Sequence, residues 1–263
     1  MSQAVQWVDL ALPHGHERIE FQWVGLADAT GPVMVFLHEG LGSLSMWKDF
    51  PDRLCKRLAC KGLVYSRPGY GASHVTQPAL PWGADFMHRQ AHDTLPALLH
   101  ALQVQAPLVL LGHSDGASIA LLYAALRPQS CKAVIALAPH LFVEAKTLLA
   151  IEALQDPHVR QPLLARLAPY HQDPRSALER WSQAWLAPDF VAWSITDTMT
   201  ALQCPVLAVQ GSQDEYGSLV HLQTLAQHHA ATEQLVIEAC GHAPHRDQAE
   251  LLSAAICEFF KHL

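Results

Sequence analysis

The sequence lacks several features that would assign it to whole classes of protein. Its apolar stretches, such as residues 107–111 and 132–139, are far shorter than the roughly 20 residues that a helix needs to cross a bilayer. Charged residues make up only 16% of the chain, and the net charge of -7 is mild for 263 residues. No run of Lys or Arg could follow a line of phosphates. We therefore expect neither a membrane nor a nucleic acid as a partner.

The cysteines and histidines show no clear metal or redox motif. The six cysteines include no Cys-x-x-Cys pair, so we expect reduced, mostly buried thiols. His88 and His92 stand four residues apart, but no Glu follows His88 and no third ligand is evident. A phosphate-binding loop and the glycine fingerprint of dinucleotide binding are also absent. We expect no metal and no cofactor.

The first residues lack the basic start and apolar run of a signal peptide, so we expect a cytoplasmic protein. Half of the residues are apolar, which is typical of a compact globular chain with a sizeable core.

Short apolar segments alternate along the chain with longer segments of helical periodicity. This alternation predicts an α/β fold, with a mostly parallel central sheet of eight strands and helices on both faces. The first two strands are expected to form a hairpin that turns near residues 13–15. The expected strands are 6–12, 18–26, 33–37, 63–66, 107–111, 133–137, 206–209 and 234–238. The expected helices are 44–60, 85–104, 114–127, 218–229 and 248–262.

The strand pattern disappears between Pro139 and Cys204, where prolines separate helix-like segments. We expect residues 140–200 to form a helical lid, inserted into a core domain of residues 1–139 and 201–263. Aromatic side chains are more numerous there than a surface segment needs. We expect some to cover a pocket and others to form a small core of the lid. They include Phe142, Tyr170, Trp181, Trp185, Phe190 and Trp193.

The strongest chemical motif is Gly-His-Ser-Asp-Gly at residues 112–116, between an apolar strand and an Ala-rich helix. A serine in such a sharp strand-to-helix turn presents its Oγ to a substrate, and the flanking glycines avoid collisions. The backbone N–H of Asp115 would lie at the helix start, where a negative oxygen is stabilised. The pattern also fits a tight turn that merely contains serine. The rest of the chain must therefore supply the partners that a nucleophile needs.

A serine hydroxyl needs a base, and the base needs an acid that orients it. The strand at 206–209 is followed by Asp214 and Glu215, at the sheet edge where open α/β sheets build their sites. Asp214 is the preferred acid and Glu215 the alternative, although either could instead cap the next helix. The last strand leads to His242, which follows a glycine that permits a tight loop. His245 is the alternative base.

Together these motifs resemble those of the α/β-hydrolase superfamily over essentially the whole chain. Residues 112–116 resemble its nucleophile elbow, residues 211–214 its acid loop and residues 240–242 its histidine loop. The resemblance implies that Ser114, Asp214 and His242 act as nucleophile, acid and base. Because the elbow carries serine and not a carboxylate, epoxide opening and halide displacement are disfavoured.

Residues 38–42, His-Glu-Gly-Leu-Gly, resemble the oxyanion loop of the superfamily, with Glu39 where glycine is usual. By this resemblance the second oxyanion donor, beside Asp115, is the backbone N–H of Gly40, or of Leu41 if the turn is shifted. Residues 44–47 are similar to those of 3-oxoadipate enol-lactonase-like hydrolases. The expected pocket residues are His38, Glu39, His113, His140 and Trp185.

We therefore expect a serine hydrolase that cleaves a carboxylic ester, a lactone or a related acyl bond through an acyl-enzyme. The lid aromatics favour a small-molecule substrate with an apolar or aromatic group. The alternatives are a carbon–carbon bond hydrolase or thioesterase with the same triad, and a non-catalytic binding or interaction protein on this fold. Arg67 and Arg246 could anchor a substrate, but we expect packing or surface roles, with Arg246 in a salt bridge to Asp247.

Overall fold

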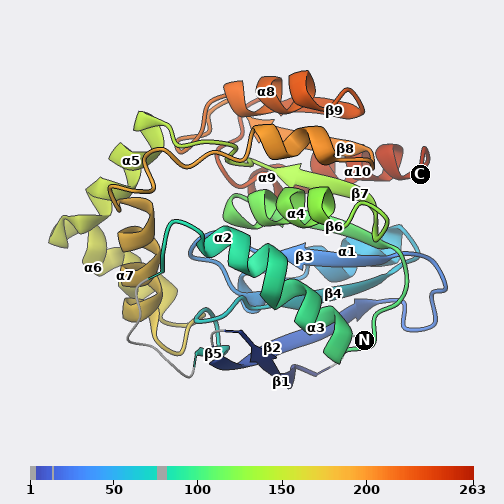
Figure 1. Ribbon diagram of the computed structural model, residues 1–263, viewed down its shortest axis with the longest axis horizontal. Helices are drawn as coiled ribbons and strands as arrows, with labels where there is room; N and C mark the ends of the chain where they lie inside the picture. The colour runs from blue at the N-terminus through green and yellow to red at the C-terminus, as the bar shows by residue number, and fades with distance from the viewer. Residues whose placement is uncertain (1–3, 14, 76–81) are drawn as a thin grey trace.

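The computed structural model describes residues 4–13, 15–75 and 82–263, and a mixed sheet runs through its centre (Figure 1). Eight strands follow the order β1-β2-β4-β3-β6-β7-β8-β9, and the short β5 pairs with β2. From β4 to β9 the neighbouring strands are parallel, whereas β2 is antiparallel to its neighbours. The strands are β1 Gln6–Leu12, β2 Gly15–Gly25, β3 Val33–Leu37, β4 Lys61–Tyr65, β5 His74–Val75, β6 Leu108–His113, β7 Cys131–Leu137, β8 Val206–Gly211 and β9 Thr232–Ile237.

This sheet confirms the expected mostly parallel architecture. All eight predicted strands occur, and the two-residue β5 is the addition that the sequence pattern did not predict. The opening hairpin is confirmed by the antiparallel pairing of β1 with β2. Its expected turn includes His14, which lies outside the described residues.

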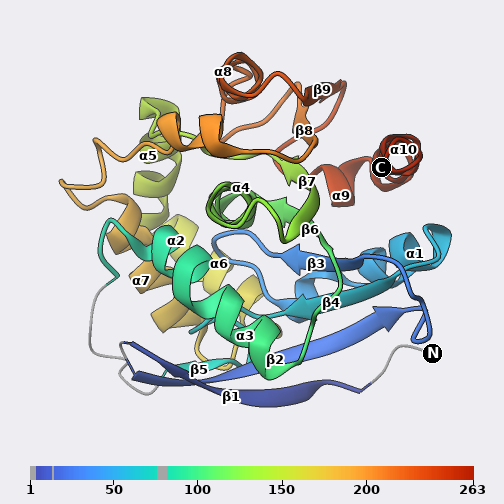
Figure 2. The same cartoon turned by 45° about the vertical axis from the view of Figure 1, so that its right-hand side comes forward.

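Helices cover both faces of the sheet (Figure 2). The five residues of β3 are all buried, and they alternate between two core clusters. Val33, Val35 and Leu37 face the cluster that includes α3 and α4, whereas Met34 and Phe36 face the cluster that includes α1 and α10. A strand buried on both faces has no polar side, which explains its continuous apolar sequence.

Ten α-helices occur in the described residues. They are α1 Phe50–Arg57, α2 Phe86–Arg89, α3 Leu95–Ala101, α4 Asp115–Leu126, α5 Ala145–Glu152, α6 Pro157–Leu167, α7 Pro174–Trp185, α8 Val220–His228, α9 Pro244–Asp247 and α10 Ala249–Phe260. None of the helices in these parts of the chain is long and apolar enough to cross a membrane.

Two predicted helices are interrupted. The helix expected at 44–60 begins as a 3₁₀ turn, breaks at Lys48 with φ of +55°, and resumes as α1. The helix expected at 85–104 contains a π-helical segment, Gln90–Thr94, between α2 and α3. Pro96 lacks the N–H that would bond the carbonyl of His92 four residues earlier. Arg127 donates to that carbonyl instead, at 3.4 Å.

Residues 140–200, between β7 and β8, contain helices α5, α6 and α7, the 3₁₀ helix Ala153–Gln155, and all but the last residue of the 3₁₀ helix Asp197–Ala201. We call this segment the insertion. It lies beside one end of the sheet, on the left in Figure 1. Its helices bring both apolar and charged side chains to a pocket at that end, so the insertion helps to build the site described next.

Candidate active site

A pocket of about 650 Å³ lies between the carboxyl ends of the central strands and the insertion. Its core side is formed by residues that follow β3, β6, β7, β8 and β9, which is where open α/β sheets place their ligands. Its other side comes from helices α5, α6 and α7. The lining residues of these helices are Thr147, Ile151, Leu163, Arg166, Leu167, Trp181 and Trp185.

Ser114 occupies the turn between β6 and α4, and it lines this pocket. Its φ of +54° is a conformation that residues with a Cβ rarely adopt. A Cβ on Gly116 would lie 2.1 Å from the carbonyl oxygen of Leu37, and one on Gly112 would lie 2.2 Å from that of Gly116. Both flanking positions therefore require glycine, and the chain has the strained elbow geometry expected from its motif.

Asp214 and His242 are in direct contact. Both carboxylate oxygens of Asp214 lie 2.9 Å from Nδ1 of His242. The carboxylate also accepts hydrogen bonds from the backbone N–H of Tyr216 at 2.8 Å and of Gly217 at 3.1 Å. Burial opposes ionisation, but these bonds and His242 hold the pKa of Asp214 below its usual value. Because Nδ1 donates to Asp214, Nε2 is the nitrogen left to accept a proton.

The alternative acid and base occupy other places. The carboxylate of Glu215 accepts the backbone N–H of His242 at 3.1 Å and does not contact the imidazole. His245 is buried, with its ring centroid 4.6 Å from that of Trp47, and it does not line the pocket. The structure therefore pairs Asp214 with His242, which lines the pocket together with Ser114. Glu215 also lines this pocket, but its carboxylate binds the backbone of His242, and His245 lies outside the pocket.

Residues 39–42 form a β-turn, closed by a 3.0 Å hydrogen bond from the N–H of Gly42 to the carbonyl of Glu39. Its two central residues, Gly40 and Leu41, line the pocket together with Asp115. Within the described residues, no hydrogen bond to another backbone group is donated by the N–H of Gly40, Leu41 or Asp115. These are the three groups that the sequence indicated as oxyanion donors, and their residues line the same pocket as Ser114.

The side chain of Glu39 is paired, which explains how it fits where glycine was expected. It accepts from Nη2 of Arg246 at 2.6 Å and lies 3.4 Å from Nδ1 of His113. Burial raises the pKa of Glu39, but His113 and Arg246 outweigh that effect and hold it well below its usual value. The expected bridge from Arg246 to Asp247 is wrong, because Arg246 pairs with Glu39 instead, while Asp247 accepts the backbone N–H of Gly241 at 2.9 Å.

His38 and Arg67 hold the 39–42 turn from behind. His38 accepts the N–H of Arg67 at its Nε2 (2.9 Å), so its Nδ1 donates to the carbonyl of Glu39 (2.7 Å). Arg67 donates to the same carbonyl through Nη2, also at 2.7 Å. Both side chains are fully buried, and neither lines the pocket, contrary to the expectation for His38. Their role as supports was not predicted, although Arg67 lies two residues after the end of β4, where site residues often lie.

The carboxylate of Asp115 anchors helix α7. It is fully buried and accepts from the indole nitrogens of Trp181 at 3.0 Å and Trp185 at 3.2 Å. Burial raises the pKa of Asp115, while the charge of Arg67, 3.7 Å away, opposes the rise. The two tryptophans lie on successive turns of α7 and so reach the same group. Trp185 lines the pocket, as the sequence indicated, but its polar atom is already bound to Asp115.

Two further histidines line the pocket, as expected. His113 donates from Nε2 to the backbone carbonyl of His242 at 2.7 Å, which helps to fix the histidine loop. The ring of His140 is 5.0 Å from that of Trp185 and 5.9 Å from that of His242. Burial lowers the pKa of His140 well below its usual value, so it presents a neutral imidazole to the pocket.

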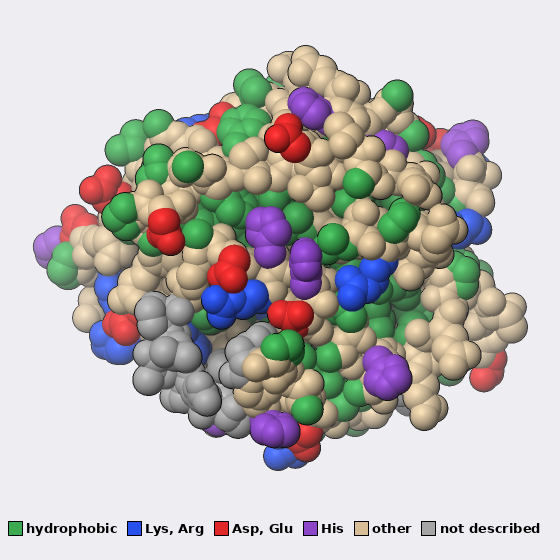
Figure 3. All heavy atoms as spheres, in the orientation of Figure 1, with side chains coloured by type: hydrophobic (Ala, Val, Ile, Leu, Met, Phe, Trp, Pro, Cys, Tyr) green, Lys and Arg blue, Asp and Glu red, His purple; other side chains and the backbone are tan. Residues whose placement is uncertain are grey.

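His88 and His92 lie away from this pocket, and their ring centroids are 6.1 Å apart. Figure 3 shows histidine side chains next to acidic and basic ones over helices α2 and α3. The described parts of the chain contain no group of three or more His, Cys, Asp or Glu that could hold a metal ion.

Comparison with solved structures places this geometry on a known fold. The chain is similar to a thermophilic esterase from Thermogutta terrifontis, with a TM-score of 0.76 and 21% identity over 98% of each chain. It is similar to the enol-lactonase from Burkholderia xenovorans, with a TM-score of 0.76 and 16% identity over 97% of this chain and 100% of the other. A proline iminopeptidase from Mycobacterium smegmatis has a TM-score of 0.72 and 18% identity over 98% of each chain.

The comparison of sequences gives the family. No curated protein matches the sequence significantly. Residues 34–255, however, match the alpha/beta hydrolase family, and this match spans most of the chain, from β3 to α10. The chain belongs to the alpha/beta hydrolase family.

Proposed function

We propose that the protein is a serine hydrolase that cleaves a carboxylic ester, a lactone or a related acyl bond. The observation that carries this proposal is the contact of both Asp214 oxygens with Nδ1 of His242, in the pocket that the strained Ser114 lines. A buried carboxylate bonded to Nδ1 fixes the imidazole tautomer that can accept a proton at Nε2. This is the arrangement that a serine nucleophile requires.

In the proposed reaction, Ser114 Oγ attacks the substrate carbonyl while Nε2 of His242 takes its proton. Asp214 stabilises the imidazolium that forms, and its lowered pKa keeps it ionised for this purpose. The N–H groups of Asp115 and Gly40, or Leu41 in place of Gly40, bind the oxyanion. His242 then protonates the leaving group, and water releases the acyl group by the reverse sequence of proton transfers.

The hydrogen bonds around the 39–42 turn favour Gly40 over Leu41 as the second oxyanion donor. The N–H of Gly40 shares a peptide plane with the carbonyl of Glu39. That carbonyl accepts from His38, Arg67 and Gly42, at 2.7, 2.7 and 3.0 Å. Three hydrogen bonds to one carbonyl fix the plane and polarise the N–H on its other side. Gly40 thus offers a donor that needs little reorganisation when negative charge develops.

The substrate is proposed to carry an apolar or aromatic group. Helices α5 and α6 bring apolar side chains, including Ile151, Leu163 and Leu167, to the pocket opposite Ser114. A cavity of about 650 Å³ accommodates a small molecule of moderate size. Similarity of residues 44–47 to enol-lactonase-like hydrolases, and the fold shared with an esterase, favour esters and lactones as the first substrates to examine.

The test is hydrolysis of p-nitrophenyl esters by wild type, Ser114→Ala and Ser212→Ala. Ser212 is an exposed residue of the acid loop that does not line the pocket, so its variant controls for the loss of a serine hydroxyl. We expect Ser114→Ala to lose several orders of magnitude in kcat, and Ser212→Ala to match the wild type. Ester hydrolysis retained by a folded Ser114→Ala protein would contradict the proposal.

A substrate panel separates the proposed reaction from its alternatives. Short esters, aromatic esters and lactones should be turned over in preference to acyl thioesters and vinylogous diketones. Turnover of a vinylogous diketone without ester hydrolysis would instead assign a carbon–carbon bond hydrolase. Absence of turnover on the whole panel, with no reaction toward a serine-directed phosphonate, would favour a non-catalytic binding protein.

A further inference from the structure

We propose that His171, in the connection between α6 and α7, is a positioning residue that holds the 39–42 turn in place for catalysis. This inference rests on the proposed function, because it concerns the oxyanion donors of that reaction. His171 lies 130 positions from Leu41 in the sequence, and nothing in the motifs indicated that the two meet. A residue of the insertion thereby becomes part of the support of the catalytic core.

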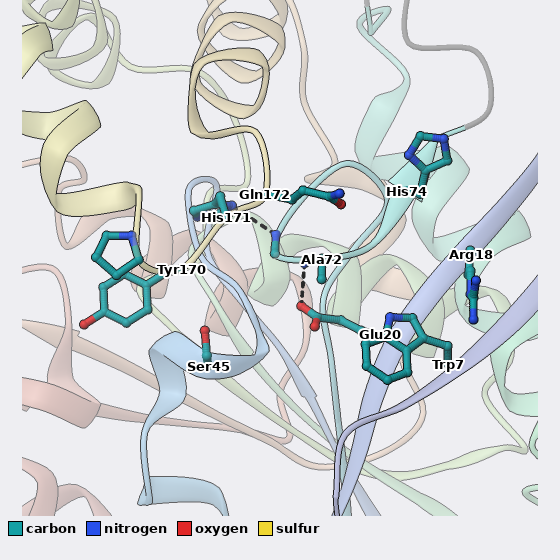
Figure 4. Close-up of a pocket in the computed structure, with 11 residues that line it drawn as sticks. Trp7, Arg18, Glu20, Ser45, Ala72, His74, Tyr170, His171 and Gln172 are labelled. Carbon is teal, nitrogen blue, oxygen red and sulfur yellow. Dashed lines mark hydrogen bonds between the residues drawn. The ribbon is translucent and has the colours of Figure 1, made fainter.

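The two ring nitrogens of His171 have fixed and different roles. Nδ1 accepts the backbone N–H of Gly71 at 3.0 Å, shown as a dashed line in Figure 4. The proton must therefore be on Nε2, which donates to the carbonyl of Leu41 at 3.0 Å. The side chain is buried, and burial lowers the pKa of His171, which keeps this neutral tautomer.

The ring is anchored independently of the turn that it supports. Gly71 makes two bonds to the insertion. Its N–H donates to Nδ1 of His171, and its carbonyl accepts the backbone N–H of Gln172 at 2.8 Å. Two consecutive residues of the insertion thus bind one residue of the core. The imidazole is directed toward Leu41 before any substrate arrives.

The 39–42 turn is consequently held at both ends. His38 and Arg67 bind the carbonyl of Glu39, which fixes the peptide that carries the N–H of Gly40. His171 binds the carbonyl of Leu41, which fixes the peptide that carries the N–H of Gly42. That N–H closes the turn on Glu39, so releasing Leu41 loosens the closing bond and with it the direction of the oxyanion donor.

His171 also lies at a boundary between two cavities. It lines a second, open cavity of about 780 Å³ beside β2 (Figure 4). Pro169 and Tyr170, just before it, line both this cavity and the candidate active site. The connection between α6 and α7 is therefore a thin wall of the active site, and the two bonds of His171 hold this wall against the core.

Two variants of His171 each remove one of the two hydrogen bonds of its ring and keep the other. In His171→Gln the side-chain amide nitrogen can reach the position of Nε2, so the bond to Leu41 is kept and the bond to Gly71 is lost. In His171→Asn the amide oxygen can reach the position of Nδ1, so the bond to Gly71 is kept and the bond to Leu41 is lost. Each variant removes one bond of the same buried ring, and each is the control for the other.

The experiment measures kcat and KM on a p-nitrophenyl ester, the melting temperature, and inhibition by an alkyl trifluoromethyl ketone, whose adduct carries an oxyanion. We expect His171→Asn to lose roughly 10- to 100-fold in kcat, with KM changed less than about 3-fold, because a small displacement of a donor has such effects. The inhibition constant should rise by a similar factor. His171→Gln should stay within about 3-fold of the wild type, at a similar melting temperature.

Equal losses in the two variants, or a loss confined to KM, would overturn the positioning role while leaving the serine hydrolase intact. Losses that follow the melting temperatures of the variants, without the change in inhibition, would overturn it too. A wild type that neither hydrolyses esters nor reacts with a phosphonate would instead refute the proposed function, and the role of His171 would fall with it.

Discussion

Ser114 is held in a strained backbone conformation by the two elements that meet at it. Its N–H donates to the carbonyl of Leu137 in β7 at 2.8 Å, and its carbonyl accepts the N–H of Ala117 in α4 at 2.9 Å. Strain of this kind persists only where the surrounding structure maintains it. The close approach of Gly116 to the end of β3 is what lets α4 begin directly after the serine.

Gly116→Ala should therefore destabilise the protein. The added Cβ would lie 2.1 Å from the carbonyl oxygen of Leu37, a backbone atom that cannot move aside easily. We expect a loss of about 1–3 kcal/mol in the free energy of unfolding, measured by urea denaturation. Gly31→Ala is the control, because a Cβ there would meet nothing within 4 Å. Equal stability of the two variants would contradict this account of the elbow.

Single-residue variants also test whether Asp214 or Glu215 is the acid that orients His242. Asp214→Asn should lower kcat by roughly 10⁴-fold, since the amide no longer fixes the tautomer of His242. Glu215→Gln should change kcat little, because the Glu215 side chain binds the backbone N–H of His242, and an amide oxygen can accept the same hydrogen bond. Steady-state kinetics on one ester compares the two, and a larger loss in Glu215→Gln would reverse the assignment.

Single residues also show which parts of the candidate site could be predicted from the sequence. The elbow, the acid and the histidine loop each lie within a few residues of a strand end, so local motifs indicated them. The roles of the supports could not be predicted in this way, although Arg67 also lies near a strand end. Arg67 and His171 act through bonds to residues that are 28 and 130 positions away. No local pattern encodes such a contact, because it exists only once the sheet and the insertion have assembled.

At the scale of elements, the insertion is fixed to the core through the elbow itself. Trp181 and Trp185 of α7 donate to the carboxylate of Asp115, which lies next to Ser114, the proposed nucleophile. The sequence predicted an insertion with more aromatic side chains than a surface needs, but it could not divide them between pocket and core. The structure assigns these two to both purposes, since they line the pocket and anchor the helix.

Trp181→Phe and Trp185→Phe should each destabilise the protein, because each removes a hydrogen bond to a buried carboxylate. We expect about 1.5–3 kcal/mol per variant in the free energy of unfolding. Trp193→Phe is the matched control, because Trp193 is buried in the same cluster and its indole nitrogen has no hydrogen-bond partner among the described residues. A Trp193 variant as unstable as the other two would show that ring packing, and not the bond to Asp115, anchors α7.

Element boundaries show where periodicity fails as a guide. The strands were predicted well because central strands are continuously apolar. The 85–104 helix was predicted as one piece because its apolar period continues through the π-helical segment. The break follows from Pro96 and from the donor that Arg127 supplies across 35 positions. The proline is visible in the sequence, but the compensating contact is not.

For the whole molecule, Asp214 links the site to the stability of the fold at low pH. Its folded-state pKa lies below the value of 3.8 expected for an exposed aspartate, so below about pH 4 the unfolded chain binds the extra proton. Stability from the Asp214 contacts is therefore present above this range and is lost as the pH falls. One proton corresponds to a slope of about 1.4 kcal/mol per pH unit.

The free energy of unfolding of Asp214→Asn should consequently fall less steeply with decreasing pH than that of the wild type. We expect the difference in unfolding free energy between the two proteins to be constant above pH 5 and to shrink as the pH falls from 4 to 2. The raised pKa of Asp115 contributes with the opposite sign, but it is common to both proteins and cancels. Urea denaturation at a series of pH values measures the difference, and a difference that stays constant to pH 2 would contradict the assignment.

The measurement that most directly tests the central claim is labelling with a fluorophosphonate, followed by peptide mapping by mass spectrometry. If Ser114 is the nucleophile of a serine hydrolase, the wild type should gain one covalent adduct, located on Ser114. His242→Ala should react far more slowly, since the base that activates the hydroxyl is gone. A wild type that forms no adduct, or one labelled at another residue, would contradict the account.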